Sequence, residues 1–194
     1  HTINIENATF TNNPVKGCGA IFLMDQSNAG NASAINVYGG TFTDNACLLS
    51  STSYGSGSIA RLKSPGALHF YGGTFANNTT VVGKNYEGIY LRDVSQKLGS
   101  NVYVHKLSAD LNVYLTPSSA KVFMSRIVVD SALTHMISVY IADNRVPAKG
   151  MPLVVGTDEY KLSEADLAMV KSANPKATFY LDTENNAICI AKAE

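Results

Sequence analysis

A ten-residue stretch that recurs at near-constant spacing constrains this chain more than any other feature. Its two clearest copies, residues 36–45 and 69–78, share Tyr-Gly-Gly-Thr-Phe, and a weaker copy spans residues 4–13. The phenylalanines are 32 and then 33 residues apart, and an asparagine follows each three residues later. A period of this size indicates one supersecondary unit stacked on copies of itself. The residues that recur in all three copies are Phe10, Phe42 and Phe75, with Asn13, Asn45 and Asn78.

Two families of strands are expected in each repeat. The first alternates apolar and polar residues, as half-buried strands do. Its inward pairs are Ile3/Ile5, Ile35/Val37, Leu68/Phe70 and Val102/Val104, and the same phase is expected at Leu111/Val113. The second family consists of residues 19–25, 57–63 and 87–93, which align without gaps. This alignment predicts a single interior column of Ile21, Ile59 and Ile89.

Short strands without intervening helices, and identical residues at the corners, predict an all-β fold, namely a parallel β-solenoid. Its coils would pair about 4.8 Å apart, and the repeated asparagines would bond to one another along the stack. An antiparallel sandwich also offers alternating strands. A sandwich, however, does not require a corner motif to return at a fixed interval, so the repeat favours the solenoid.

Three motifs carry a resemblance to a known family: Gly17-Cys-Gly-Ala-Ile21, and the Gly-Gly-Thr-Phe segments at residues 39–45 and 72–78. They resemble the right-handed parallel β-helix proteins of the pectin-lyase-like superfamily, and most closely the repeats of bacterial surface proteins and adhesins. The resemblance covers residues 1–106. It implies the architecture but not an activity, because that superfamily includes lyases, hydrolases, adhesins and spacers.

The repeat fades after residue 106, which divides the chain into coils at 1–106 and a β-rich capping region at 107–194. Within that region, Ser163-Glu-Ala-Asp166 has the form of a capping box and predicts one short helix, ended by Pro175. Residues 178–181 and 187–190 are expected to form a hairpin. The region would cover the open end of the sheets, whose unpaired backbone groups could otherwise recruit another chain.

Composition narrows the possible partners. Lys+Arg and Asp+Glu are balanced at 15 each, so no basic field argues for nucleic acid. Charged residues make up only 15%, a polar but weakly charged composition common in extracellular β-rich proteins. The sequence contains no run of about 18 apolar residues, so membrane insertion is not predicted. Together with the resemblance to bacterial surface proteins, this composition predicts a cell-surface or secreted protein. The chain begins inside a repeat without a signal peptide, so we expect it to be one part of a longer protein.

No cofactor or metal site is predicted. The three cysteines, Cys18, Cys47 and Cys189, are too scattered for a disulfide framework or a zinc site and are expected to be buried small hydrophobes. No two histidines have the spacing of metal ligands. His135, which lies between apolar stretches, is expected to be structural.

The second strand family contains charged residues of the types used in catalysis, but their arrangement does not suit a catalytic site. The gapless alignment places Lys63 between Asp25 and Asp93 in one column. Alternating charges on neighbouring strands stabilise a ladder, whereas carboxylates held for catalysis are seldom separated by a cation. Arg61 falls at a position where its aligned neighbours are leucines, which predicts a local shift of register because burying an unpaired guanidinium is costly. We therefore predict no catalytic residues.

The outward side chains of the first strand family form the candidate binding surface. Stacking of the coils would place Tyr38 beside Tyr71, Tyr71 beside His105, and His69 beside Tyr103 in the next column. Exposed aromatic side chains on a rigid sheet suit sugar rings, although aromatic ladders also stabilise parallel sheets without binding anything. Tyr71 would lie at the centre. Binding would weaken below about pH 6 if neutral histidines accept hydrogen bonds from the ligand.

Three functions remain open on the sequence. The leading hypothesis is a non-catalytic extracellular module of a bacterial surface protein, serving in adhesion or contact with a glycan or another host-surface ligand. The second is the C-terminal part of a β-helix glycoside hydrolase or polysaccharide lyase whose catalytic coils lie upstream. The third is a structural spacer.

Overall fold

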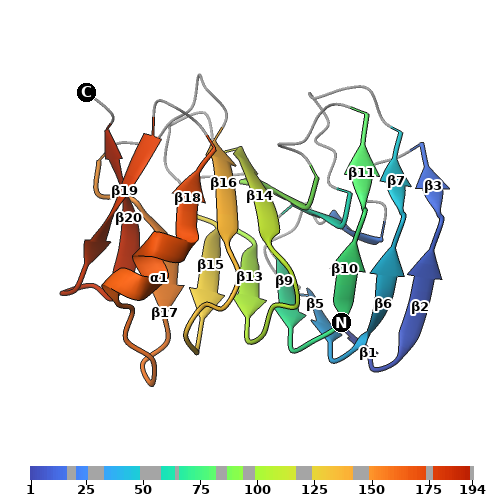
Figure 1. Ribbon diagram of the computed structural model, residues 1–194, viewed down its shortest axis with the longest axis horizontal. Helices are drawn as coiled ribbons and strands as arrows, with labels where there is room; N and C mark the ends of the chain where they lie inside the picture. The colour runs from blue at the N-terminus through green and yellow to red at the C-terminus, as the bar shows by residue number, and fades with distance from the viewer. Residues whose placement is uncertain are drawn as a thin grey trace.

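The computed structural model describes an all-β protein with mainly parallel sheets and one short helix in its described part (Figure 1). The described residues are 1–16, 21–25, 33–48, 58–63, 66–81, 87–93, 99–116, 124–141, 149–173 and 177–192. Cys18 and the first four residues of the motif at 17–21 lie outside them.

The described strands form four sheets. The eight-stranded sheet has the order β1 (Thr2–Ile5), β5 (Ser33–Val37), β9 (Gly66–Phe70), β13 (Asn101–Val104), β15 (Arg126–Val129), β17 (Pro152–Gly156), β20 (Ala187–Lys192), β19 (Ala177–Asp182). The six-stranded sheet has the order β18 (Val170–Ser172), β16 (Ile137–Ile141), β14 (Leu111–Thr116), β12 (Ile89–Arg92), β8 (Ala60–Lys63), β4 (Phe22–Asp25). The two three-stranded sheets are β10 (Thr74–Ala76), β6 (Gly40–Thr43), β2 (Ala8–Thr11), and β11 (Thr79–Thr80), β7 (Ala46–Cys47), β3 (Pro14–Val15).

Each of the first three repeats contributes one strand to every sheet in turn, and equivalent strands pair in parallel. In the eight-stranded sheet, Ile3 pairs with Ile35 and Ile35 with Leu68, while Asn36 pairs with His69. The expected phases are confirmed in β5, β9 and β13, whose inward residues are buried, whereas Ile3 keeps the register but is 57% exposed on the outermost strand β1. Leu111 and Val113 are the exception, because β14 pairs with β12 in the six-stranded sheet and so belongs to the second family.

The two glycines of the repeated motif have different physical roles. A Cβ at Gly72 would lie 2.8 Å from the carbonyl oxygen of Tyr38 in the preceding repeat, closer than real Cβ contacts come. Gly73 instead has a φ of +101°, which side chains rarely adopt. The first glycine therefore permits close stacking of the repeats, and the second permits the turn from β9 into β10.

The Phe-x-x-Asn part of the motif builds the interior corner. Phe10, Phe42 and Phe75 stack with ring centroids 5.4 and 4.6 Å apart. The residue before each asparagine is left-handed, with φ between 53° and 57° at Asn12, Asp44 and Asn77. This turn directs the asparagines inward, where the amide of Asn13 donates to Asn45 Oδ1 and that of Asn45 to Asn78 Oδ1, both at 2.9 Å. The predicted phenylalanine column and asparagine ladder are both confirmed.

The predicted gapless column of the second strand family is wrong by one residue. Ile21 remains level with Ile59, whose carbonyl accepts from the Ile21 amide, but Ile89 pairs with Ala60. The shift sets Leu62 rather than Arg61 beside Leu91, so two fully buried leucines share the core position. This is the local shift that Arg61 predicted.

The predicted charge column holds for its first pair, since Asp25 pairs with Lys63, but Lys63 pairs with Arg92 rather than Asp93 in the shifted register. The side chains of Asp25, Arg61, Lys63 and Arg92 lie outside the described residues. Asp93 is buried, and its carboxylate accepts hydrogen bonds from the backbone amides of Met124 and Ser125 at 2.7 and 3.1 Å. It therefore fixes the approach to β15 rather than belonging to a charge ladder.

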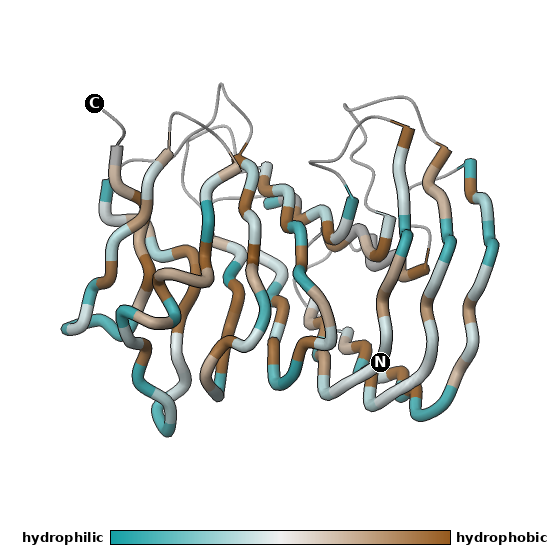
Figure 2. Tube along the Cα trace, in the orientation of Figure 1, coloured by the Kyte–Doolittle hydropathy of each residue, from teal (hydrophilic) through white to brown (hydrophobic). Residues whose placement is uncertain are grey.

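Parallel pairing continues well past residue 106. The two three-stranded sheets end with β10 and β11, but the eight- and six-stranded sheets continue in parallel as far as β17 and β18. Figure 2 shows brown segments recurring along the strands of both halves, and one hydrophobic core includes residues from Phe22 to Ile190. After residue 106, therefore, the two three-stranded sheets gain no further described strands, while the hydrophobic core continues.

The C-terminal segment closes with a helix and a hairpin. Helix α1 (Glu164–Met169) begins after Ser163 with the predicted capping box, but it ends at Met169, well before Pro175, because β18 begins directly after it. The predicted hairpin is confirmed as β19 and β20, and β20 pairs antiparallel with β17.

Candidate functional site

The outward face of the eight-stranded sheet carries two adjacent rows of aromatic side chains, which we call the aromatic face: Tyr38, His69, Tyr71, Tyr103 and His105. In one row, Tyr38 stacks on Tyr71 and Tyr71 on His105, with centroids 4.7 and 4.0 Å apart. In the other row, His69 stacks on Tyr103 at 4.2 Å. All three predicted neighbour pairs are confirmed, and the rings are parallel to within 14°.

Stacking determines which part of each ring a ligand can reach. Both faces of Tyr71 are covered, one by Tyr38 and the other by His105, so Tyr71 presents its edge and hydroxyl to solvent. Tyr38 has a described ring on one face only and is the more exposed, at 47% against 37% for Tyr71. Tyr38 therefore offers more of its ring to a ligand, beside Glu6 of the preceding repeat, whereas Tyr71 offers a hydrogen-bonding group.

The Tyr71 hydroxyl is kept in its neutral form. Its pKa is raised, first by burial and then by the neighbouring Tyr38 and Asp130. The hydroxyl therefore remains able both to donate and to accept at neutral pH. Beside these rings, the Asn36 amide donates to Asn4 Oδ1 at 2.8 Å and continues the second row with polar groups.

A chain of hydrogen bonds links the two rows. Asp130 Oδ2 lies 2.5 Å from His105 Nδ1, and His105 Nε2 lies 3.2 Å from His69 Nδ1. The pKa of His69 is lowered, first by burial and second by His105. Asp130 was missed by sequence reasoning. It directly follows β15, whose Val129 pairs with Val104, so the register of β13 and β15 brings Asp130 level with His105.

An open groove of about 390 Å³ adjoins His105. It is formed by residues 104–107 and 131–134, and Lys106, Ser131 and Thr134 contribute its polar groups. Its size falls in the range of small-ligand sites, about 300–1,000 Å³. The groove therefore extends the aromatic face toward the C-terminal repeats.

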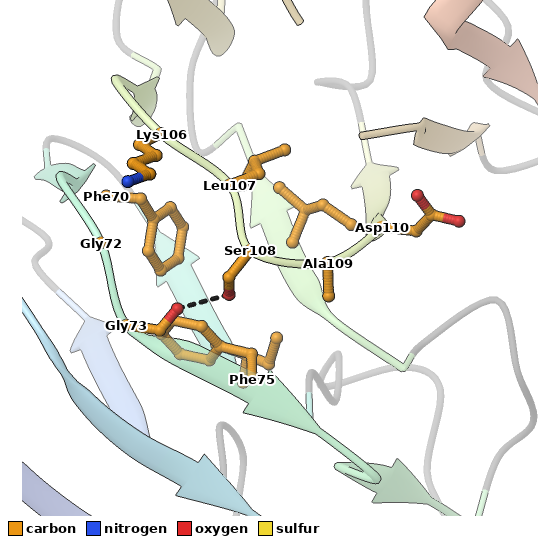
Figure 3. A pocket seen from close by; sticks show the side chains of 11 residues that line it. Phe70, Gly72, Gly73, Phe75, Lys106, Leu107, Ser108, Ala109 and Asp110 are labelled. Atoms are coloured by element: carbon orange, nitrogen blue, oxygen red, sulfur yellow. Dashed lines mark hydrogen bonds between the residues drawn. The ribbon is translucent and has the colours of Figure 1, made fainter. Parts of the chain in front are cut away.

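The cavity in Figure 3 is too small for a ligand. It lies where residues 106–111 pass over the turn between β9 and β10, and it holds about 20 Å³, enough for about one water molecule. The Ser108 hydroxyl donates to the Gly73 carbonyl at this point, as the dashed line shows. The contact covers part of the outer edge of β10, and the cavity is a packing feature.

A second groove, of about 510 Å³, lies beside β10 and β11 where the three-stranded sheets end. Two carboxylates, Glu87 and Asp110, line it together with Asn77, Asn78 and Asn112. Asp110 Oδ1 accepts a hydrogen bond from the backbone amide of Met136 at 2.8 Å, which fixes the position of that carboxyl group. Sequence reasoning did not bring Glu87 and Asp110 together, because β14 was placed in the wrong strand family.

Other expected features of the site concern metals, cysteines and membranes. Within the described residues, no three His, Cys, Asp or Glu side chains are grouped so as to hold a metal ion. Cys47 and Cys189 are buried, as expected. His135 lies 3.1 Å from the Thr134 hydroxyl through Nδ1. No helix in the described part of the chain has the length and apolar character needed to cross a membrane.

Comparison of the chain with protein-family models, curated proteins and solved structures finds no match. The resemblance to the pectin-lyase-like superfamily therefore rests on the repeat motifs alone.

Proposed function

We propose that this chain is a non-catalytic extracellular module of a bacterial surface protein, which adheres through weak contacts with glycans. The observation that carries the proposal is the aromatic face, where exposed tyrosines and histidines lie in parallel rows on a regular sheet. Such a surface offers the exposed ring of Tyr38 and a line of hydroxyl and imidazole edges, which together suit a polyhydroxylated ligand.

We further propose that the architecture is a right-handed parallel β-helix closed by a C-terminal cap. Parallel in-register pairing over three four-stranded repeats supports the helix, as do the stacked phenylalanines and asparagines. The cap is supported by contacts of β18 with α1 and β19 at the edge of the six-stranded sheet. The low charged fraction, 15%, supports an extracellular location.

The test is a glycan array of plant and mucin glycans, probed with wild type, Tyr38→Ala and Tyr71→Ala. Affinity should be weak even for wild type, because an open surface buries little of its ligand. Tyr38→Ala should lose most binding, because Tyr38 is the most exposed ring of the aromatic face. Tyr71→Ala should lose binding as well, because Tyr71 supports Tyr38 and supplies a hydroxyl.

Tyr140→Ala is the matched control, since Tyr140 also stacks on a tyrosine, at 5.0 Å, but on the six-stranded sheet. Binding by all four proteins alike, or none by wild type, would reduce the aromatic face to a structural ladder. That result would favour the spacer hypothesis.

A hydrolase or lyase is the second candidate, favoured by the presence of Glu87 and Asp110 in the lining of one groove. Glycosidases use two carboxyl groups about 5–9.5 Å apart. Incubation with pectic and mucin polysaccharides should then release reducing sugars with wild type but not with Glu87→Gln or Asp110→Asn. Absence of release by wild type would reject this groove as a catalytic site for these substrates.

A further inference from the structure

The hydrogen-bonded chain across the aromatic face fixes where each imidazole carries its proton. An ionised carboxylate only accepts hydrogen bonds, so Asp130 requires a proton on His105 Nδ1. Neutral His105 then has a lone pair on Nε2, which can only accept. His69 must therefore donate from its Nδ1, which leaves a lone pair on His69 Nε2.

We propose that Asp130, His105 and His69 form a proton relay that holds His69 Nε2 as the acceptor for a glycan hydroxyl group. The inference rests on the proposed glycan contact and adds to it the bonding atom and its regulation. Among the described residues, no protein group bonds His69 Nε2. A sugar hydroxyl is a ready donor to such an atom.

Uptake of one proton reverses the polarity of the relay. A proton from solvent binds His69 Nε2, and the proton on His69 Nδ1 passes to His105 Nε2. His105 is then an imidazolium opposite the Asp130 carboxylate, while His69 stays neutral and now carries N–H at Nε2. The acceptor has become a donor, and the net change is one proton gained.

The surroundings favour this distribution of charge. Asp130 Oδ2 lies 2.5 Å from His105 Nδ1, so a carboxylate adjoins the imidazole that receives the proton, while burial first and His105 second lower the pKa of His69. The other titratable groups around the pair are Tyr71 and Tyr103, stacked on the two imidazoles, and Lys106 in the adjoining groove. Each imidazole stacks on a tyrosine to within 2°, and the two imidazole rings are parallel to within 8°, which restricts their rotation.

The first arm of the test is nitrogen-15 NMR of the full chain without ligand, at about pH 8 where unperturbed histidines are neutral. Both His69 and His105 should carry their protons on Nδ1. Asp130→Asn replaces a group that can only accept by an amide that can also donate to His105 Nδ1, so protonation of His69 Nε2 should increase although His69 does not touch residue 130. A proton on His69 Nε2 in wild type, or an unchanged His69 in the variant, would overturn the relay.

Asp44→Asn is the matched control. It removes the same charge from a corner where the equivalent residues, Asn12 and Asn77, are already asparagines with the same backbone conformation. It should leave both histidine tautomers unchanged. Asp130→Ala provides a second variant without an amide that could donate to His105.

The second arm measures affinity for the strongest array glycan at about pH 8 and about pH 5.5. Loss of one hydrogen bond corresponds to about tenfold in affinity. Wild type should weaken by this factor at the lower pH, and Asp130→Asn should weaken by it at the higher pH. Equal affinities would overturn the role of His69 in binding while leaving the proposed function intact. If wild type binds no glycan at all, both the proposed function and the role of His69 Nε2 as an acceptor for glycan hydroxyls are rejected. The histidine tautomers measured by NMR would still show whether the relay exists.

Discussion

The interior corner and the aromatic face are both ladders of stacked side chains produced by the same repeat, yet they differ in composition. Inside, each rung is identical, with phenylalanine above phenylalanine and asparagine above asparagine. Outside, one row runs from Tyr38 through Tyr71 and His105 to Asp130. Every interior rung fills the same space and satisfies the same backbone groups, whereas solvent imposes no such identity. Variation on the outer rows is therefore where binding chemistry can develop.

The largest expected effect is on the interior column. Phe42 is fully buried between Phe10 and Phe75, so Phe42→Ala should lower the free energy of unfolding by about 4 kcal/mol. Phe42→Leu, which keeps most of the volume, is the control and should lose much less. Urea denaturation measures both, and a loss below about 1 kcal/mol for Phe42→Ala would contradict the role of this column.

The second effect concerns the asparagine ladder. Asn45 is fully buried, donates to Phe10 O and Asn78 Oδ1, and accepts from the amide of Asn13. Asn45→Ala leaves these groups without partners and should cost about 3 kcal/mol. Asn36→Ala removes an amide that pairs in the same manner on the outer face and should cost a few tenths of a kcal/mol at most. Equal losses in urea denaturation would erase the distinction between the two ladders.

A smaller effect is expected from the centre of the aromatic face. Tyr71→Ala should cost about 1 kcal/mol, because stacking on an exposed sheet stabilises weakly. The loss should be well below that of Phe42→Ala, although both residues stack on two rings. Thermal denaturation of the two variants side by side shows which loses more stability. A larger loss for Tyr71→Ala would show that the outer row stabilises the fold more than the interior column does.

The smallest effect is a difference in pH dependence between the ladders. Because folding lowers the pKa of His69 below its ordinary value of 6.5, through burial first and His105 second, the unfolded chain binds its proton more readily. The stability contributed by His69 is therefore complete above 6.5 and declines as the pH falls below that value. The difference in unfolding free energy between wild type and His69→Gln should shrink from about pH 8 to about pH 5.

Phe42→Ala supplies the contrast, because the interior column contains no titratable group. Its difference from wild type should stay constant over the same range. A shrinking difference for Phe42→Ala, or a constant one for His69→Gln, would show that the pH dependence arises elsewhere.

The sequence by itself determined the repeating unit and everything that depends on strict repetition. Because equivalent strands pair in parallel and in register, residues one period apart become neighbours. Spacing alone therefore located the Phe10–Phe42–Phe75 column and the stacking of Tyr38 on Tyr71. The capping box at Ser163 was also readable, since it depends on contacts within four residues.

Only the tertiary structure decided which residues become neighbours where consecutive repeats differ in length. The one-residue shift of β12 against β8 arises from packing of Leu91 on Leu62, and the sequence offered only Arg61 as a sign of it. The placement of Asp130 beside His105 depends on how β15 pairs with β13 across a spacing of 25 residues, where the motif no longer recurs. Pairing register is a property of the packed sheets, and once the repeat length changes, no local pattern in the chain specifies it.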